Sequence, residues 1–108
     1  MDWQTNFNLE IDNAQTARSS GNEGRARVCA RRAAGIAIRE YFTRQGETIR
    51  KPSSYDLLEM ISGEKHLSTE IRRAAKNLTL RITEDSKLPI DVNLIQEARL
   101  LCEGLLSE

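Results

Sequence analysis

Proline, aromatic residues and long apolar runs are scarce in this sequence of 108 residues. Its two prolines both lie between periodic apolar stretches, and aromatic residues make up only 5% of the chain. No apolar run approaches the roughly 20 residues that a membrane-spanning helix needs, and no basic and apolar leader opens the chain. Cys29 and Cys102 stand far apart, outside any CxxC pair. We therefore expect a cytoplasmic protein with two buried, reduced thiols and no membrane contact.

Histidine is represented by a single residue, His66. One histidine and two distant cysteines lack the ligand spacing of a metal site, and the sequence nominates no nucleophile or orienting carboxylate beside His66. The turn at residues 21–25 lacks the lysine and the spacing of a phosphate-binding loop. The sequence therefore indicates no catalytic residue, no metal site and no cofactor, and it predicts that His66 lies in solvent.

Alanine, leucine, isoleucine and arginine dominate what is present, and this mixture favours helices. The formal net charge is zero, so the whole molecule has no electrostatic bias toward nucleic acid or membrane. The charge is nevertheless unevenly distributed: residues 18–51 hold nine Arg or Lys against three Glu, and the segment on each side sums to −3. A basic middle between acidic ends can pair within the fold or bind an acidic partner.

Apolar residues recur at steps of three or four in five segments, and no segment alternates with a period of two. Capping residues begin these segments, with Asn22, Ser53 or Ser54, Ser68 or Thr69, and Asp91 at the later four. The predicted helices cover residues 2–19, 22–45, 53–61, 68–82 and 91–106, with loops at 46–52 and 83–90. Short loops favour antiparallel neighbours. The predicted fold class is thus all-α, a single antiparallel bundle of about five helices in one domain over residues 1–108.

The second predicted helix carries more apolar surface than a peripheral helix needs. Its expected core face holds Ala26, Cys29, Ala33, Ile36, Ala37 and Tyr41. The opposite side, which a simple monomer would keep polar, holds Val28, Gly35, Ile38 and Phe42. Arginines spaced by seven residues form a row along one edge of this strip: Arg25, Arg32 and Arg39. Arg27 and Arg31 form a second row along its other edge.

Two interpretations of this helix are open. In the first it is central, so that both sides are buried within one subunit and the arginine stems lie over apolar surface. In the second the far side contacts a second copy or a partner protein, a role for which arginine is well suited. The contact residues would then be Val28, Arg32, Gly35, Ile38, Arg39 and Phe42. A nucleic-acid surface on Arg25, Arg32 and Arg39 is a further alternative, although few aromatic side chains are present to stack on bases.

The order of these features resembles the HEPN family of small helical bundles over residues 6–106. Segment 25–45, rich in alanine and ending near the aromatic pair Tyr41-Phe42, is similar to the second helix of that family. Segments 57–82 and 91–106 are similar to its middle and last helices. The ribonuclease motif of the family, an arginine separated from a histidine by four to six residues, is missing, because positions 59–61 hold Glu, Met and Ile.

What the resemblance implies is a non-catalytic, dimerising helical module, of a kind often coupled to a nucleotidyltransferase or to nucleic-acid processing. The sequence therefore predicts a non-enzymatic interaction module that binds a second copy or a partner protein. An RNA-binding or degenerate ribonuclease module, and a structural subunit of a larger complex, are the alternatives.

Overall fold

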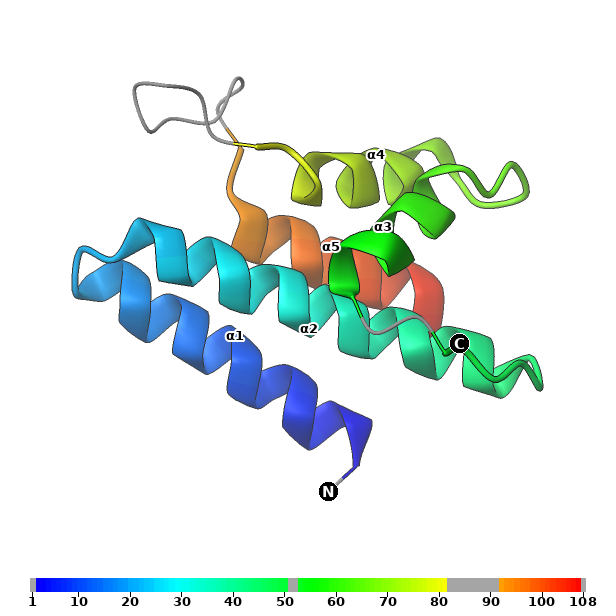
Figure 1. Ribbon diagram of the computed structural model, residues 1–108, viewed down its shortest axis with the longest axis horizontal. Helices are drawn as coiled ribbons and strands as arrows, with labels where there is room; N and C mark the ends of the chain where they lie inside the picture. Colours follow the sequence, from blue (N-terminus) through cyan, green and yellow to red (C-terminus); the bar gives the residue numbers. More distant parts are fainter. Residues whose placement is uncertain (1, 51–52, 82–91, 108) are drawn as a thin grey trace.

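The computed structural model describes residues 2–50, 53–81 and 92–107. Within these ranges the chain forms five helices and no strand: α1 (Trp3–Ser19), α2 (Glu23–Arg44), α3 (Ser54–Ser62), α4 (Thr69–Leu78) and α5 (Leu94–Leu106). The predicted all-α class is confirmed. Figure 1 shows α1 and α2 as an antiparallel hairpin, with α5 and the α3–α4 pair on the other side of α2. None of the helices in the described part of the chain is long and apolar enough to cross a bilayer.

Helix α2 is the centre of this bundle. It packs against α1, α3 and α5, whereas α4 packs on α3 and α5. Five alanines of α2 are fully buried, and their small side chains let the neighbouring helices approach closely: Ala26, Ala30, Ala33, Ala34 and Ala37. Large buried side chains from the other helices, such as Leu57, Leu78 and Leu101, fill the space around them. The first interpretation of the second helix, in which both sides are buried within one subunit, thus holds where α1, α3 and α5 pack against α2, but not at Val28, which is 41% exposed.

Each helix begins at a polar side chain that accepts a backbone N–H group of the first turn. These N-cap residues are Asp2, Asn22, Ser53, Ser68 and Asn93. The predicted caps of the second, third and fourth helices are therefore confirmed. The cap of the last helix is Asn93, whose side chain accepts from the backbone of Ile95 and Gln96, and not the predicted Asp91. Asp91 itself lies outside the described residues.

Helix α4 ends earlier than its apolar spacing predicts. The sequence pattern continues to Ile82, but α4 ends at Leu78. Arg31 of α2 donates from Nε to the carbonyl oxygen of Leu78 at 2.7 Å and from Nη2 to that of Leu80 at 2.8 Å. A side chain from another helix therefore satisfies carbonyl groups that would otherwise need further helical turns or water. Ile82 and the predicted loop 83–90 lie outside the described residues.

Candidate functional site

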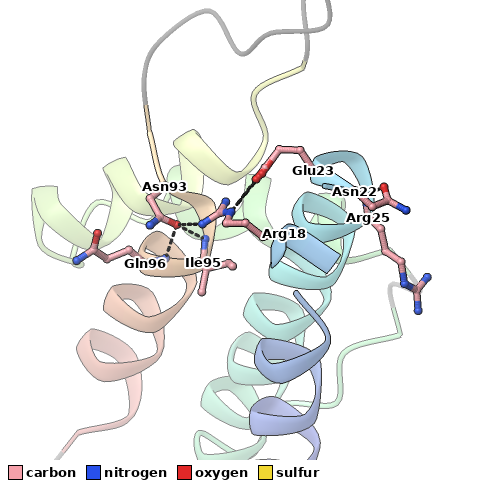
Figure 2. A network of polar contacts seen from close by, with 7 residues as sticks. All are labelled: Arg18, Asn22, Glu23, Arg25, Asn93, Ile95 and Gln96. Atoms are coloured by element: carbon pink, nitrogen blue, oxygen red, sulfur yellow. Dashed lines mark hydrogen bonds and ion pairs between the residues drawn. The ribbon is translucent and has the colours of Figure 1, made fainter. Parts of the chain in front are cut away.

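A cluster of polar contacts fixes the start of α2 beside the start of α5 (Figure 2). Arg18, near the end of α1, donates from Nε to Glu23 at 2.7 Å and from Nη1 to Oδ1 of Asn93 at 2.8 Å. Oδ1 of Asn22 accepts the backbone N–H of Arg25 at 3.1 Å and so caps α2. Figure 2 shows the side chain of Arg25 directed away from this cluster. Arg25 is therefore held at the helix start without taking part in the packing between α1, α2 and α5.

One side of α2 stays open between the helices that surround it, and we call it the open face. Its residues lie within about 80° of one another on a helical wheel: Arg25, Val28, Arg32, Ile36, Arg39 and Thr43. Arg25, Arg32 and Thr43 are exposed, and Val28 is 41% exposed. Ile36 and Arg39 are half-buried. The predicted row of Arg25, Arg32 and Arg39 thus lies on the open face, together with Val28.

Three of the predicted partner-contact residues are buried within the chain itself, which corrects the prediction for Gly35, Ile38 and Phe42. Ile38 is 0% exposed and Phe42 is 5% exposed, and both belong to the same core cluster as Leu57 and Leu58 of α3. Gly35 lies against Ser54, the first residue of α3. The physical reason is that α3 covers this side of α2, so these residues are core. Of the apolar strip, only Val28 is left on the surface.

The two carboxylates of α2 are already paired. Glu23 forms an ion pair with Arg18 at 2.7 Å, and Glu40 forms one with Arg44 at 3.0 Å. Neither of these arginines belongs to the open face. Arg25 and Arg32, by contrast, make no side-chain hydrogen bond or ion pair with any residue of the described ranges, and Arg39 has an interaction of its own. The open face therefore carries positive charge that these carboxylates leave uncompensated.

Arg27 and Arg31, the second predicted row, lie on a different side of α2. They line a pocket of about 480 Å³ together with Tyr55 of α3 and with the segment that follows α4, including Arg81. Burial lowers the pKa of the Arg31 guanidinium below its ordinary value, and the positive charges of Arg27 and Arg81 lower it further. The two arginine rows of the sequence thus have different surroundings, one on an open helix face and one in a hollow.

His66 lies in solvent, as predicted, with 64% of its side chain exposed. It nevertheless has partners on both ring nitrogens that sequence reasoning missed: Oε2 of Glu64 lies 3.2 Å from Nδ1, and the hydroxyl of Tyr41 lies 3.2 Å from Nε2. Glu64 is two residues away from His66 in the chain, so the sequence could suggest this contact. Tyr41 lies on α2, 25 residues away, and no local pattern indicates that contact. Water competes for both contacts of this exposed side chain. We therefore assign no catalytic role to His66.

The two cysteines are both free and have different environments. Cys29 is buried in the core, as predicted, whereas Cys102 is only half-buried. Burial raises the pKa of the Cys102 thiol, and the nearby Glu103 carboxylate adds to this effect. Across the described residues, no three His, Cys, Asp or Glu side chains are grouped as a metal site would require.

Comparison with models of known protein families, with curated proteins and with solved structures finds no match for this chain. The resemblance to HEPN proteins therefore stays a prediction. The functional proposal depends on the geometry and charge of α2 and its neighbours.

Proposed function

We propose that this chain is a non-catalytic, HEPN-like interaction module that binds an acidic helix of a partner protein along the open face of α2. The observation that supports this proposal is that Arg25 and Arg32 are exposed in one row on α2. The two carboxylates of the same helix form ion pairs with other arginines and do not neutralise this row. A guanidinium pairs with a carboxylate through two parallel hydrogen bonds. An acidic partner would supply the negative charge that the open face lacks.

The spacing of the arginines favours a helical partner. Positions seven residues apart on an α-helix lie almost in line and about 10 Å from one another along the axis. A helix that presents carboxylates at every seventh residue has the same repeat, so each carboxylate can reach one arginine when the two axes are nearly parallel. Val28 and Ile36 lie between the arginines and supply the small apolar contact that such packing needs.

A second copy of the same chain fits this face less well than a different protein does. Placing one open face on another would bring the arginines of the two copies together, and like charges repel. No helix in the described part of the chain carries two carboxylates seven residues apart. The exposed apolar area contributed by Val28 is also small for the core of a homodimer interface. We therefore expect the chain alone to sediment as a monomer.

RNA is a weaker match to the open face than an acidic helix. Binding of single-stranded nucleic acid combines positive charge with aromatic side chains on which bases stack. The open face has no aromatic residue, and Phe42, the nearest aromatic candidate from the sequence, is buried. The arginine row alone would give electrostatic binding that falls steeply with salt.

The proposal can be tested with a helical peptide that carries glutamate at every seventh position. Amide chemical shifts of the labelled chain, recorded during a titration at low salt, detect weak binding and locate it. We expect the largest shifts at Arg25, Val28 and Arg32, and we expect the Arg25→Glu/Arg32→Glu variant to lose the binding. A matched control, Arg73→Glu/Arg99→Glu, changes the charge equally at exposed positions on α4 and α5 and should leave binding unchanged.

A peptide of the same composition but with the glutamates at shuffled positions is the control for the spacing. It shows whether binding requires a glutamate at every seventh position or only negative charge. Equal binding of both peptides, or equal loss in both charge-reversal variants, would contradict the proposal. Tighter binding of a single-stranded oligouridylate than of the peptide with glutamate at every seventh position would favour an RNA-binding function in place of the proposed one.

A further inference from the structure

The pocket on the other side of α2 has a composition that points to a ligand. It lies between the first half of α2, the start of α3 and the segment after α4, and its volume is about 480 Å³. This volume lies within the range of small-molecule sites, roughly 300–1,000 Å³. Arg27, Arg31 and Arg81 line it, and so does Tyr55, whereas none of its lining residues within the described ranges is acidic.

Arg31 is held rigidly at the wall of this pocket. Its Nε and Nη2 groups donate to the carbonyl oxygens of Leu78 and Leu80 at 2.7 and 2.8 Å. A guanidinium has five N–H donors, and the other three make no hydrogen bond to the described residues, so they can meet a molecule in the pocket. Because the side chain is already fixed by the fold, a ligand would lose little free energy in ordering it.

Arg81 and Tyr55 form a second wall. The guanidinium carbon of Arg81 lies 5.4 Å from the centre of the Tyr55 ring, a cation–π arrangement. Tyr55 is half-buried and comes from α3, whereas Arg81 follows α4. Because the guanidinium lies over one face of the Tyr55 ring, a planar group of a ligand could extend this stack on a remaining face of the pair.

Within residues 2–50, 53–81 and 92–107, the three arginines have no negative partner that would explain their gathering. Arg27 makes no hydrogen bond or ion pair with any residue of the described ranges. Within the same ranges, the contact of Arg81 is with the Tyr55 ring. Burial is the first cause of the lowered pKa of Arg31, and the positive charges of Arg27 and Arg81 lower this pKa further. An anion with several oxygens would relieve the repulsion and accept the free donors.

We propose that this pocket binds a phosphate monoester that carries a planar ring. The phosphate oxygens accept hydrogen bonds from Arg27 and Arg31, while the ring stacks against Tyr55 and Arg81. The phosphate matches the arginine charges, and the volume leaves room for an organic group beyond the phosphate. This site is separate from the open face, so its function does not depend on the proposed partner helix.

Four probes test this assignment by isothermal titration calorimetry: phenyl phosphate, glycerol 3-phosphate, inorganic phosphate and phenol. We expect phenyl phosphate to bind most tightly, the two phosphates without a ring to bind more weakly, and phenol not to bind. The Arg27→Gln variant should weaken phenyl phosphate binding about tenfold or more, because a charge-assisted hydrogen bond is lost. Tyr55→Leu should lower the affinity toward that of glycerol 3-phosphate.

Arg25→Gln is the matched control, since it removes the same charge from the open face of the same helix. Thermal unfolding of every variant shows that each one is folded when its binding is measured. An equal loss of affinity in Arg25→Gln and Arg27→Gln, or no saturable binding of phenyl phosphate to the native chain, would overturn the site. Equal binding of glycerol 3-phosphate and phenyl phosphate would overturn the role of the ring wall.

Discussion

Gly35 of α2 lies directly against Ser54, the first residue of α3. A Cβ atom added at position 35 would lie 3.0 Å from Cβ of Ser54 and 3.4 Å from its Cα, and closer still to its hydroxyl oxygen. The 3.0 Å distance between the two Cβ atoms is shorter than an ordinary contact between carbon atoms. The glycine therefore permits the close approach of α3 to α2 and serves the fold of the subunit.

Replacing this glycine should destabilise the protein. We expect Gly35→Ala to lower the free energy of unfolding by about 1–3 kcal/mol, the range for forcing an extra carbon into a packed site. Gly24→Ala is the control, because the nearest atom to its added Cβ lies 3.9 Å away. That variant should be neutral or more stable by up to about 1 kcal/mol, as expected for alanine in a helix. Urea unfolding monitored by circular dichroism measures both values.

A second substitution on α3 should rescue the first. Ser54→Gly removes the Cβ and the hydroxyl that the new methyl group would meet, so the Gly35→Ala/Ser54→Gly pair should be more stable than the sum of the two single changes predicts. Strict additivity of the two free-energy changes would contradict the contact between α2 and α3.

Ile38 and Phe42 should behave as core residues and Val28 as a surface residue. Truncation of a large buried side chain leaves a cavity, so Ile38→Ala and Phe42→Ala should each lower the free energy of unfolding by about 2–5 kcal/mol. Val28→Ala should change it by no more than about 0.5 kcal/mol. The same urea unfolding experiment compares all three, and a small effect at Ile38 or Phe42 would contradict their burial under α3.

These three residues also show where the sequence is informative and where it is not. The spacing of apolar residues and the capping residues depend on local interactions. They predicted the five helices and the cap Asn22, and they placed the cap of the fourth helix at Ser68 or Thr69, of which the structure has Ser68. Whether the side of α2 that holds Ile38 is covered depends on how α3 packs, which local spacing does not encode. The strip was therefore open to interpretation either as core or as contact surface.

Local spacing also fails to predict contacts between residues that are far apart in the sequence. The hydrogen bonds from Arg31 to the carbonyl oxygens of Leu78 and Leu80 join residues that are 47 and 49 positions apart. The contact of Tyr41 with His66 spans 25 positions. The second arginine row could be recognised from the sequence. Its place in a pocket beside Arg81 required the packing of α2, α3 and α4.

Cys102 should react with iodoacetamide more slowly than an unfolded thiol does at neutral pH. The thiolate is the reactive form, and burial raises the pKa of this thiol, so less thiolate is present. The rate should therefore rise only at a higher pH than for the same cysteine in urea. The protonated Cys102 thiol also contributes to the free energy of unfolding. This contribution is fully present below the thiol pKa of the unfolded chain, and it is lost as the pH rises through the higher pKa of the folded chain.

Mass spectrometry after alkylation identifies the labelled residue. Cys29 is buried in the core and should stay unlabelled until the chain unfolds. Labelling of Cys102 in the folded chain as fast as in urea would contradict its half-buried environment.

A reciprocal exchange of charge tests most directly whether the open face of α2 binds an acidic helix. The native chain and the Arg25→Glu/Arg32→Glu variant would each be titrated with two heptad peptides, one carrying glutamate and the other lysine at every seventh position. We predict that the native chain binds only the glutamate peptide and that the folded variant binds only the lysine peptide, with amide shifts at positions 25, 28 and 32 in both cases. Failure of the folded variant to bind the lysine peptide, or binding of both peptides by the native chain, would contradict a contact made through these two arginines.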